Sequence, residues 1–488
     1  MNKHSGWGSK LTFVFAMMGA TIGIGNIWRF SYVFYNNGGG SFFIPYFIAI
    51  VVMGIPFLIL EYGLGFKFKE SFSKLLHDIN PKFEIIAWML VIFVFIIAIY
   101  YMVILSWDFI YFLNSFTFGW GTYPSSFFTS SVGGSSDLMG IGSIILPTFF
   151  GCIILWALFW FVSNNDVDKG IGLISKILMP LLFIIMSVIL LYSLTLPGFD
   201  LGLKTLFTPN WNMLFDINIW LAAFAQIVFS LSMGEAIAYT YASYLSEETR
   251  LIDNVLMVVV ANSIYEIFVG LGIFSILGYM SVTHSIPITE LITEGTSLIF
   301  VVLPEIFEVM GPVGRIMAPL LFLSVLFAGF TSSLALVEPL LSSLCEKLGW
   351  SRKKGVTVLV IIACFGSLLF STGISSYLVE VTDTFVNEFG FLILIALQAI
   401  IFTWYFDIDE IIPVLNKNSS IKVGKKWKFT LKYILPLMLI IMWIIGVAQL
   451  IYEVDLFKLG IYLLISVIVL GFSIFFVKVR PNGQDSKE

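Results

Sequence analysis

Charged residues are scarce in this chain. Only 12% of its 488 residues are Asp, Glu, Lys or Arg, whereas 59% are hydrophobic. Soluble proteins carry about 25% charged residues, because their surfaces face water. The composition therefore excludes an ordinary soluble protein and indicates a protein whose surface faces a lipid bilayer.

Histidine and cysteine are also few, with three of each. The cysteines Cys152, Cys345 and Cys364 lie in or beside apolar segments without metal-ligand spacing, so we expect packed thiols. Ser, His and Asp form no recognisable catalytic motif, so we expect no enzyme. A net charge of −5 gives no basic face for a nucleic-acid partner.

Apolar stretches long enough to cross a bilayer, about 20 residues each, recur from end to end. The first stretch lacks a small-residue cleavage site, so we expect it to remain in the protein and not to be removed as a signal peptide. We predict about twelve transmembrane helices, at residues 10–34, 40–66, 86–115, 141–161, 168–195, 217–243, 254–282, 311–345, 355–371, 378–405, 430–451 and 458–478.

Basic residues indicate the orientation in the membrane. Lys67, Lys69 and Lys74 follow the second predicted span, and further clusters follow the eighth and precede the eleventh. Residues 116–140, between the third and fourth spans, contain no Lys or Arg. The positive-inside rule then predicts a multi-pass cell-membrane protein with both termini in the cytoplasm.

Two predicted spans are interrupted in the same way. Glycine and Ser or Thr gather at mid-membrane depth in residues 19–26 of the first span and 229–235 of the sixth. Backbone groups freed inside a membrane cost several kcal/mol each unless protein, ligand or ion satisfies them, so a broken helix indicates a buried polar site. Small residues can instead serve close helix packing.

The spacing of the two interrupted spans predicts an internal repeat. We expect one membrane transporter domain over residues 1–488, without a long polar linker. It would hold an inverted 5+5 repeat, the first half at about 10–195 and the second at about 217–405, followed by two extra helices at about 430–478. The predicted fold class is an all-α polytopic membrane protein with broken helices 1 and 6.

A set of ordered motifs resembles the neurotransmitter:sodium symporter family, and within it the prokaryotic sodium-coupled amino-acid transporters. The resemblance covers at least residues 1–405, whereas the last two helices match by hydropathy alone. It rests on Trp7 to Leu11, Gly19 to Asn26, Arg29-Phe30, Asn37 to Tyr46, Glu61, Tyr100-Tyr101, Lys169-Gly170, Gln226 to Gly234, Asn262 and Ala328 to Ser333.

The resemblance implies two sodium ions, and no chloride is expected. The first site would use the carbonyl of Thr21, the side chains of Asn26 and Asn262, Ser230, and the substrate carboxylate. All these side-chain donors are hard oxygens, which suit Na⁺. The second site would use the carbonyls of Gly19, Ile22 and Ala328 with the hydroxyls of Thr331 and Ser332.

The resemblance also implies a substrate pocket. Tyr101 would bind the substrate carboxylate, and Phe229 would close over it. Arg29 and Asp383 would join Tyr101 and Phe229 as an outer gate, unless they form an ordinary interfacial ion pair. The implied lining is Ala20, Thr21, Ile24, Gly25, Ile97, Tyr101, Phe229, Ser230, Ser232, Glu235, Ser332 and Leu336.

Gly23 bears on the substrate class. Members of the family that carry monoamines have Asp at the matching position, where it supplies the carboxylate that an amine lacks. A substrate with its own carboxylate fits a glycine better, so we expect a small amino acid. An amine transporter, or a sensor of this fold that binds without transport, remains the alternative. A channel is disfavoured, because no pore-lining ring or selectivity motif is present.

Glu235 departs from the family pattern, which usually has an aromatic residue there. An intramembrane acid costs a few kcal/mol unless it is paired, protonated or hydrated. Glu235 would pair with a cationic substrate side chain, sit at a half-helix N-terminus with water and hydroxyls, or be protonated and packed. These three alternatives stay open at the level of the sequence.

Other intramembrane acids carry expectations from the same resemblance. Glu266 lies one turn after Asn262, where chloride-dependent members have a small polar residue beside a bound chloride. It would replace the chloride, so we expect chloride-independent transport; a packing role is the alternative. Glu61 would brace the unwound part of the sixth helix, and for Glu338 only its position suggests a network role.

An inner gate is expected on the cytoplasmic side. Lys3 or His4, close to Trp7, would pair with Glu346, with Tyr244 nearby. The resemblance thus implies alternating access in a lipid bilayer, whereas the carried amino acid, the number of ions per cycle and the oligomeric state are not predicted.

Overall fold

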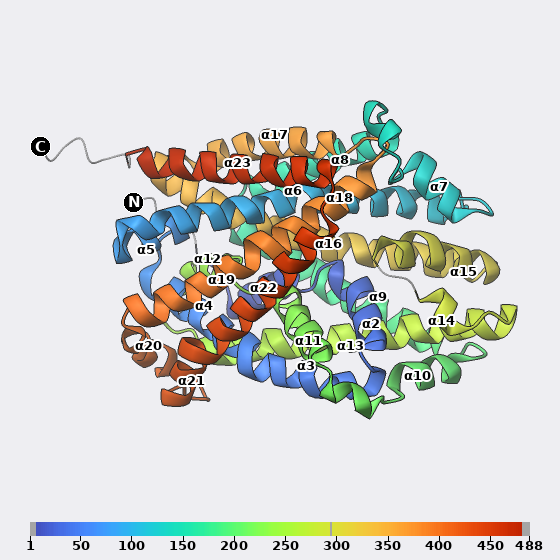
Figure 1. The fold of residues 1–488 in the computed structure, drawn as a ribbon, viewed down its shortest axis with the longest axis horizontal. Helices are drawn as coiled ribbons and strands as arrows, with labels where there is room; N and C mark the ends of the chain where they lie inside the picture. Colours follow the sequence, from blue (N-terminus) through green and yellow to red (C-terminus); the bar gives the residue numbers. More distant parts are fainter. Residues whose placement is uncertain (1–5, 293–294, 481–488) are drawn as a thin grey trace, which may run out of the picture.

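The computed structural model describes residues 6–292 and 295–480, and every regular element in these ranges is helical (Figure 1). The one β-bridge found there joins Ile144 to Thr372. The predicted all-α fold is therefore confirmed.

Nine helical segments of the described chain are long and apolar enough to cross a membrane. Each is a single helix or a helix continued through short π or 3₁₀ turns. They are Gly39–Phe68, Pro81–Ser115, Leu146–Ser163, Asp168–Ser193, Leu251–His284, Gly314–Leu348, Ser375–Tyr405, Lys425–Glu453 and Leu456–Lys478.

Further α-helices lie outside these segments. Besides the four helices of the two broken spans, described below, they are α5 (Phe72–Ile79), α7 (Pro124–Ser131), α10 (Phe199–Phe207), α14 (Ile288–Leu291), α15 (Leu303–Val309), α17 (Arg352–Leu369) and α20 (Ile412–Asn416). The long segments contain α3 (Phe43–Ala49), α4 (Ile55–Phe68), α6 (Glu84–Ser115), α8 (Leu146–Ser163), α9 (Leu173–Ser193), α13 (Leu251–His284), α16 (Gly314–Leu348), α18 (Ser375–Thr384), α19 (Leu392–Ile400), α21 (Lys425–Phe429), α22 (Leu435–Glu453) and α23 (Leu456–Lys478).

The first predicted span is broken where the glycines gather. Helix α1 (Lys10–Thr21) starts with a Ser9 cap, and α2 (Gly25–Asn36) follows at an angle of 70° to it. Ile22, between them, has extended backbone angles of φ −83° and ψ 95°. The break predicted around Gly23 is confirmed.

The sixth predicted span is broken as well. It consists of α11 (Ile217–Ser230) and α12 (Ile237–Ser243), separated by a non-helical segment. Ser232, Gly234 and Ala236 in that segment have positive φ angles of 46°, 78° and 58°. Left-handed conformations in alternate residues cannot continue a right-handed helix, so the chain unwinds there.

The predicted number of twelve spans is not confirmed. The described residues contain nine helices of sufficient length and hydropathy, or eleven if each of two bent pairs is one span; the pairs are Lys10–Thr21 with Gly25–Asn36, and Phe199–Phe215 with Ile217–Ser230. The sixth predicted span divides into two helices of 14 and 7 residues, each too short to cross alone. Helix α17, the ninth predicted span, begins with the charged run Arg352, Lys353 and Lys354.

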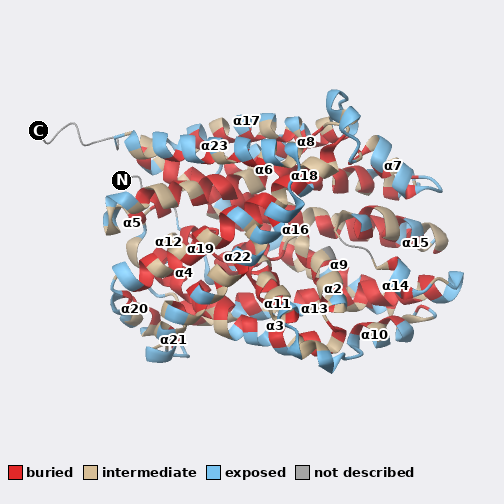
Figure 2. Cartoon of the chain, viewed as in Figure 1, coloured by how far each residue is buried: buried red, intermediate tan, exposed pale blue. Residues whose placement is uncertain are grey.

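Burial separates an inner group of helices from an outer one. The most apolar stretches of Pro81–Ser115 and Gly314–Leu348 are each 72% buried, whereas that of Leu456–Lys478 is 17% buried. Figure 2 shows buried residues along α6 and α16 and exposed residues along α23. Since the exposed side chains of α23 are mainly apolar, its outer face is suited to lipid.

Helices α4 and α12 approach closely at Gly65. A Cβ atom on Gly65 would lie 2.0 Å from the carbonyl oxygen of Tyr239. No side chain can turn away to make room, because the obstacle is backbone. Gly65 therefore fixes the distance at which the inner half of the broken sixth span packs.

We predict that Gly65→Ala lowers the free energy of unfolding by about 1–3 kcal/mol, the usual cost of overpacking. Melting temperature in detergent micelles is the measurement. Gly460→Ala is the matched control, because nothing lies within 4 Å of the added Cβ atom. Equal melting temperatures for the two variants would contradict the close approach of α4 and α12.

Candidate functional site

The side chain of Asn26 bridges the break in the first span. Its Oδ1 atom accepts a hydrogen bond from the backbone N–H of Gly23 at 2.8 Å. Its Nδ2 atom donates to Asn262 Oδ1 at 3.0 Å and to Ser230 Oγ at 3.4 Å. Three side chains expected at the first sodium site thus meet from α2, α11 and α13.

Thr21 is the last residue of α1, and its carbonyl stays a predicted ligand of the first sodium site. Its hydroxyl donates to the carbonyls of Met17 and Met18, at 3.2 and 3.3 Å, inside α1. The hydroxyl is therefore engaged within its own helix, and the carbonyl expected as a sodium ligand lies at the helix end. Asn26, Asn262 and Ser230 are all at least 95% buried, at 4%, 0% and 5% exposure.

A second set of oxygens lies between α1 and α16. The Ser332 hydroxyl donates to the carbonyl of Gly19 at 2.9 Å and to that of Ile22 at 3.3 Å. The Thr331 hydroxyl donates to the carbonyl of Ala328 at 3.0 Å. These are the five residues expected at the second sodium site.

Gly19 permits the close approach of these oxygens. A Cβ atom there would lie 2.9 Å from Thr331 Cβ and 3.2 Å from Thr331 Oγ1. All the oxygens of this group are neutral carbonyls and hydroxyls, which are ligands that a hard cation such as Na⁺ accepts. The donor set of both groups therefore fits sodium.

The two broken spans face each other across the expected substrate pocket. The Ser232 hydroxyl donates to the carbonyl of Ala20 at 3.1 Å. The Tyr101 hydroxyl, from α6, accepts a hydrogen bond from the backbone N–H of Ile24 at 2.9 Å. Tyr101 thus lies at the first break, where the substrate carboxylate is expected.

The other residues expected to line the pocket have fewer contacts that tie them to the breaks. A Cβ atom on Gly25 would meet nothing within 4 Å, so space adjoins this position. Leu336 is buried and Ile97 is half-buried against the core, but no polar contact ties either one to the breaks. Their place in the pocket stays a prediction.

Side chains of two other helices hold the break in the sixth span. Glu61 Oε2, on α4, accepts a hydrogen bond from the N–H of Gly234 at 3.3 Å. Gln398 Nε2, on α19, donates to the carbonyl of the same residue at 2.9 Å. The structure therefore places Glu61 as the expected brace, and adds Gln398, which the sequence reasoning missed.

Glu266 is completely buried but has several donors. Gln226 Nε2 donates to its Oε1 atom at 2.8 Å, and Asn26 Nδ2 does so at 3.3 Å. The Tyr46 hydroxyl donates to its Oε2 atom. Tyr46 and Gln226 belong to the sequence motifs, but nothing in the sequence assigned them to Glu266.

Comparison with known proteins decides the family. The model of the sodium:neurotransmitter symporter family matches residues 4–137 and 127–479. The chain belongs to this family. It is a sodium-dependent transporter and a membrane protein.

Two relatives illustrate the range of the family. The symporter is 34% identical over 438 residues to an uncharacterized sodium-dependent transporter of Methanocaldococcus jannaschii, with 90% of this chain and 89% of the relative covered. It is 24% identical over 478 residues to the sodium-dependent dopamine transporter of Bos taurus, covering 91% of this chain and 69% of the relative.

On one side of its broken helices the symporter has a cation–aromatic contact. The guanidinium carbon of Arg29 lies 4.0 Å from the centroid of the Phe229 ring. Asp383 accepts hydrogen bonds from the Tyr100 hydroxyl at 2.7 Å and from Asn387 Nδ2 at 2.9 Å. The structure thus joins Arg29 to Phe229 and Asp383 to Tyr100, and the grouping of Arg29, Tyr101, Phe229 and Asp383 as an outer gate stays a prediction.

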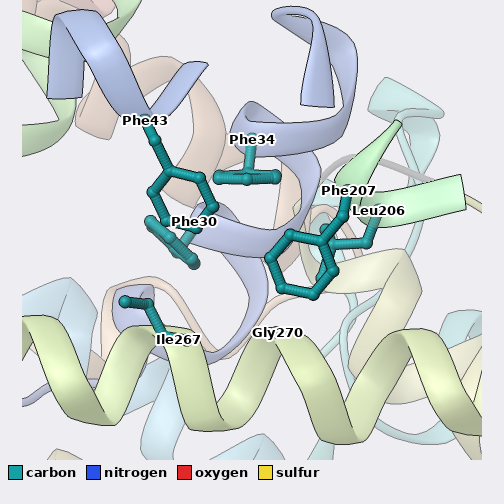
Figure 3. A pocket seen from close by; sticks show the side chains of 7 residues that line it. All are labelled: Phe30, Phe34, Phe43, Leu206, Phe207, Ile267 and Gly270. Carbon is teal, nitrogen blue, oxygen red and sulfur yellow. The ribbon is translucent and has the colours of Figure 1, made fainter. Parts of the chain in front are cut away.

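Figure 3 shows a small hollow beside this region, between α2, α3, α10 and α13. Its lining is entirely apolar, so it is distinct from the oxygen groups above. Aromatic packing there joins α2 to its neighbours: the Phe34 and Phe43 ring centroids are 4.6 Å apart. The lining residues are Phe30, Phe34, Phe43, Leu206, Phe207, Ile267 and Gly270.

The predicted inner gate is only partly within the described residues. Lys3 and His4 lie outside them. Trp7 Nε1 donates to the carbonyl of Tyr241 at 2.8 Å, and its ring packs against that of Tyr244. Glu346 accepts a hydrogen bond from the backbone N–H of Ser71 at 2.6 Å, so it is tied to the start of α5.

Glu338 and Arg352 form a more extensive contact on this side. Arg352 donates to both carboxylate oxygens of Glu338, at 2.5 and 2.9 Å, and its Nε atom donates to the carbonyl of Ser163 at 3.1 Å. The Tyr244 hydroxyl also donates to Glu338, at 3.1 Å. This Glu338 network joins α8, α12, α16 and α17.

We predict that Arg352→Lys loosens the inner side of the symporter, because lysine cannot make the bidentate contact with Glu338. Cys345 lies nearby on α16 and is half-buried. In a Cys152→Ser, Cys364→Ser background, a membrane-impermeant maleimide should label Cys345 several times faster in the variant.

Lys353→Ala is the control, because Lys353 is the exposed neighbour of Arg352. Its labelling rate should match that of the parent protein. If Cys345 is labelled as slowly in Arg352→Lys as in the parent protein, the Glu338 network does not hold the inner side closed.

Proposed function

We propose that the chain is a sodium-coupled symporter that imports a small amino acid by alternating access, with two sodium ions. The observation that carries the proposal is the convergence of oxygens from α1, α2, α11, α13 and α16 on the breaks. The first group holds Asn26, Ser230 and Asn262, and the second holds Gly19, Ile22 and Ser332.

The break between α1 and α2 joins the two ion sites. Gly19 and Ile22 belong to the second site, while Thr21 and Asn26 belong to the first, so one short segment contributes to both. Occupation of either site therefore biases the conformation of the same backbone. Each sodium ion that moves inward gains about 2.3 kcal/mol per 100 mV of membrane potential, besides its concentration gradient.

The geometry around Gly23 supports a substrate that carries its own carboxylate. A Cβ atom on Gly23 would lie 2.9 Å from the Tyr101 hydroxyl and 3.2 Å from Ser332 Oγ. An aspartate would therefore crowd both groups, and the chain has no carboxylate of its own at this position. Tyr101 and the adjoining sodium ion would then bind the carboxylate of an amino acid.

The surroundings of Glu266 support chloride independence. Its carboxylate accepts hydrogen bonds from Tyr46, Gln226 and Asn26, which are neutral donors. Neutral donors of this kind would also bind a free anion. Glu266 supplies the negative charge covalently, so a soluble chloride is not needed beside the first sodium site.

Accumulation in proteoliposomes tests the proposal. With sodium outside, an amino acid should accumulate above its external concentration, and replacement of sodium by potassium should abolish this. A sensor would bind without accumulation, and an amine transporter would accumulate amines and leave amino acids outside. Either result would refute the proposed function.

In the same assay we predict that Ser332→Ala raises the sodium concentration for half-maximal uptake about tenfold, equivalent to about 1.4 kcal/mol. The variant loses the hydroxyl that lies between the carbonyls of Gly19 and Ile22. Ser333→Ala is the matched control, because the Ser333 hydroxyl donates to Phe330 within its own helix. An unchanged sodium dependence in Ser332→Ala would remove Ser332 from the proposed ion site.

We predict that Glu266→Ser makes uptake depend on chloride. The substitution removes the fixed negative charge and leaves the donors Tyr46, Gln226 and Asn26 available to an anion. Uptake should be low in gluconate and recover in chloride, whereas the parent protein and Glu305→Ser, a change at an exposed acid, should be indifferent. Uptake that stays indifferent to chloride in Glu266→Ser would contradict this role.

A further inference from the structure

Glu235 occupies the unwound segment of the sixth span, between α11 and α12. Its neighbours Gly234 and Ala236 both have positive φ angles, at 78° and 58°. The side chain is 7% exposed, so it lies inside the bundle. Glu235 is therefore a buried acid on a backbone segment that is not helical.

The hydrogen-bonding acceptors around this segment outnumber its donors. Glu61 and Gln398 each bind Gly234 through one atom, at its N–H and its carbonyl. Their second oxygens, Glu61 Oε1 and Gln398 Oε1, are buried and have no partner, and neither does Glu235 Oε2. Three buried acceptors thus lie on side chains that hold or form one unwound segment.

Several other buried acids of the described chain have donors of their own, although Asp108 has none. Glu84 pairs with Lys347, and Glu338 pairs with Arg352. Glu266 receives hydrogen bonds from neutral side chains, as described above. Glu235 belongs to none of the ion pairs in the described part of the chain. A buried acceptor without a donor costs free energy, so an external donor would be favoured here.

The position of Glu235 relative to the expected carboxylate site indicates which part of a substrate would reach it. Ser232, three residues before Glu235, bonds to Ala20 on the first broken span. Tyr101, at the expected carboxylate end, accepts a hydrogen bond from the backbone N–H of Ile24, four residues after Ala20. A substrate bound by its carboxylate at Tyr101 would therefore have its side chain near the unwound segment that carries Glu235.

We infer that Glu235 binds a cationic group on the substrate side chain, so that the symporter selects dibasic amino acids over neutral ones of equal length. This inference rests on the proposed function, since it assumes an amino acid in the pocket. The ammonium group of the substrate supplies the donors that Glu235 Oε2 lacks. Glu61 and Gln398 keep the unwound segment in the conformation that presents the carboxylate.

Paired ligands test this inference, because lysine and norleucine differ chiefly in the terminal ammonium group, as do ornithine and norvaline. The melting temperature of the full-length protein in detergent, titrated with each ligand in sodium, gives apparent dissociation constants. The unmodified protein should bind lysine or ornithine at least tenfold more tightly than its neutral partner. Glu235→Gln should reduce this ratio to about threefold or less.

Two further variants separate charge from structure. Glu235→Asp keeps the charge and should retain a preference for the dibasic ligand. Glu305→Gln removes an exposed acid and should behave like the unmodified protein. If the Glu235 variants do not fold, equal binding of lysine and norleucine by the unmodified protein still overturns the inference.

The outcomes distinguish the two proposals. Sodium-dependent binding of neutral amino acids with no preference for dibasic ones would overturn the inference and leave the proposed function intact. A preference for lysine that survives in Glu235→Gln would also overturn it. If no amino acid binds in sodium, the proposed function fails, and the inference fails with it.

Discussion

The structure depends on one constraint, which is that a helix broken inside a membrane must find partners for its freed backbone groups. The N–H of Gly23 bonds to Asn26, and the N–H of Ile24 bonds to Tyr101. The carbonyl of Gly19 accepts from Ser332. Each partner comes from a different part of the bundle, so α2, α6 and α16 are all positioned by the first break.

The same constraint sorts the buried acids into two kinds. Glu61 accepts from backbone at the second break, and Glu266 accepts from side chains beside the first. Glu84 and Glu338 instead pair with Lys347 and Arg352. These acids thus rely either on neutral donors or on cations. Glu235 and Asp108 follow neither pattern; for Glu235, which lies on the unwound segment, a ligand is the favoured donor.

The sequence predicts the breaks but not all of their partners. Gly19 to Gly25 stand out because small and polar residues interrupt a long apolar run. This signal lies within a few neighbouring residues, so it can be read from the sequence alone. Gln398 lies 164 positions from the glycine that it binds. A lone Gln in an apolar helix carries no local signal for that contact. Arg352 is likewise one of several basic residues after α16, and only the fold selects it as the partner of Glu338.

The predicted number of twelve spans is not confirmed, and the sixth predicted span shows one reason. Hydropathy averages over about 20 residues, and it treats α11, the unwound segment and α12 as one continuous apolar stretch. The backbone at Ser232, Gly234 and Ala236 is set by contacts with Glu61, Gln398 and Ala20, which no average along the chain contains. Span counting is therefore least reliable at the functional site, where the helix is broken.

The hydrogen bonds at the proposed ion sites also explain how binding and conformation are linked. Here Ser332 donates directly to the carbonyl of Gly19, and in the other group Asn262 is hydrogen-bonded to both Asn26 and Ser230. A sodium ion that entered either group would use these oxygens as ligands and replace the direct hydrogen bonds. The side chains would then turn their oxygens towards the ion, and α1, α2 and α11 would adjust with them. Because the atoms that close the backbone breaks are also the proposed ion ligands, an ion that entered or left the proposed sites would change how the broken helices meet.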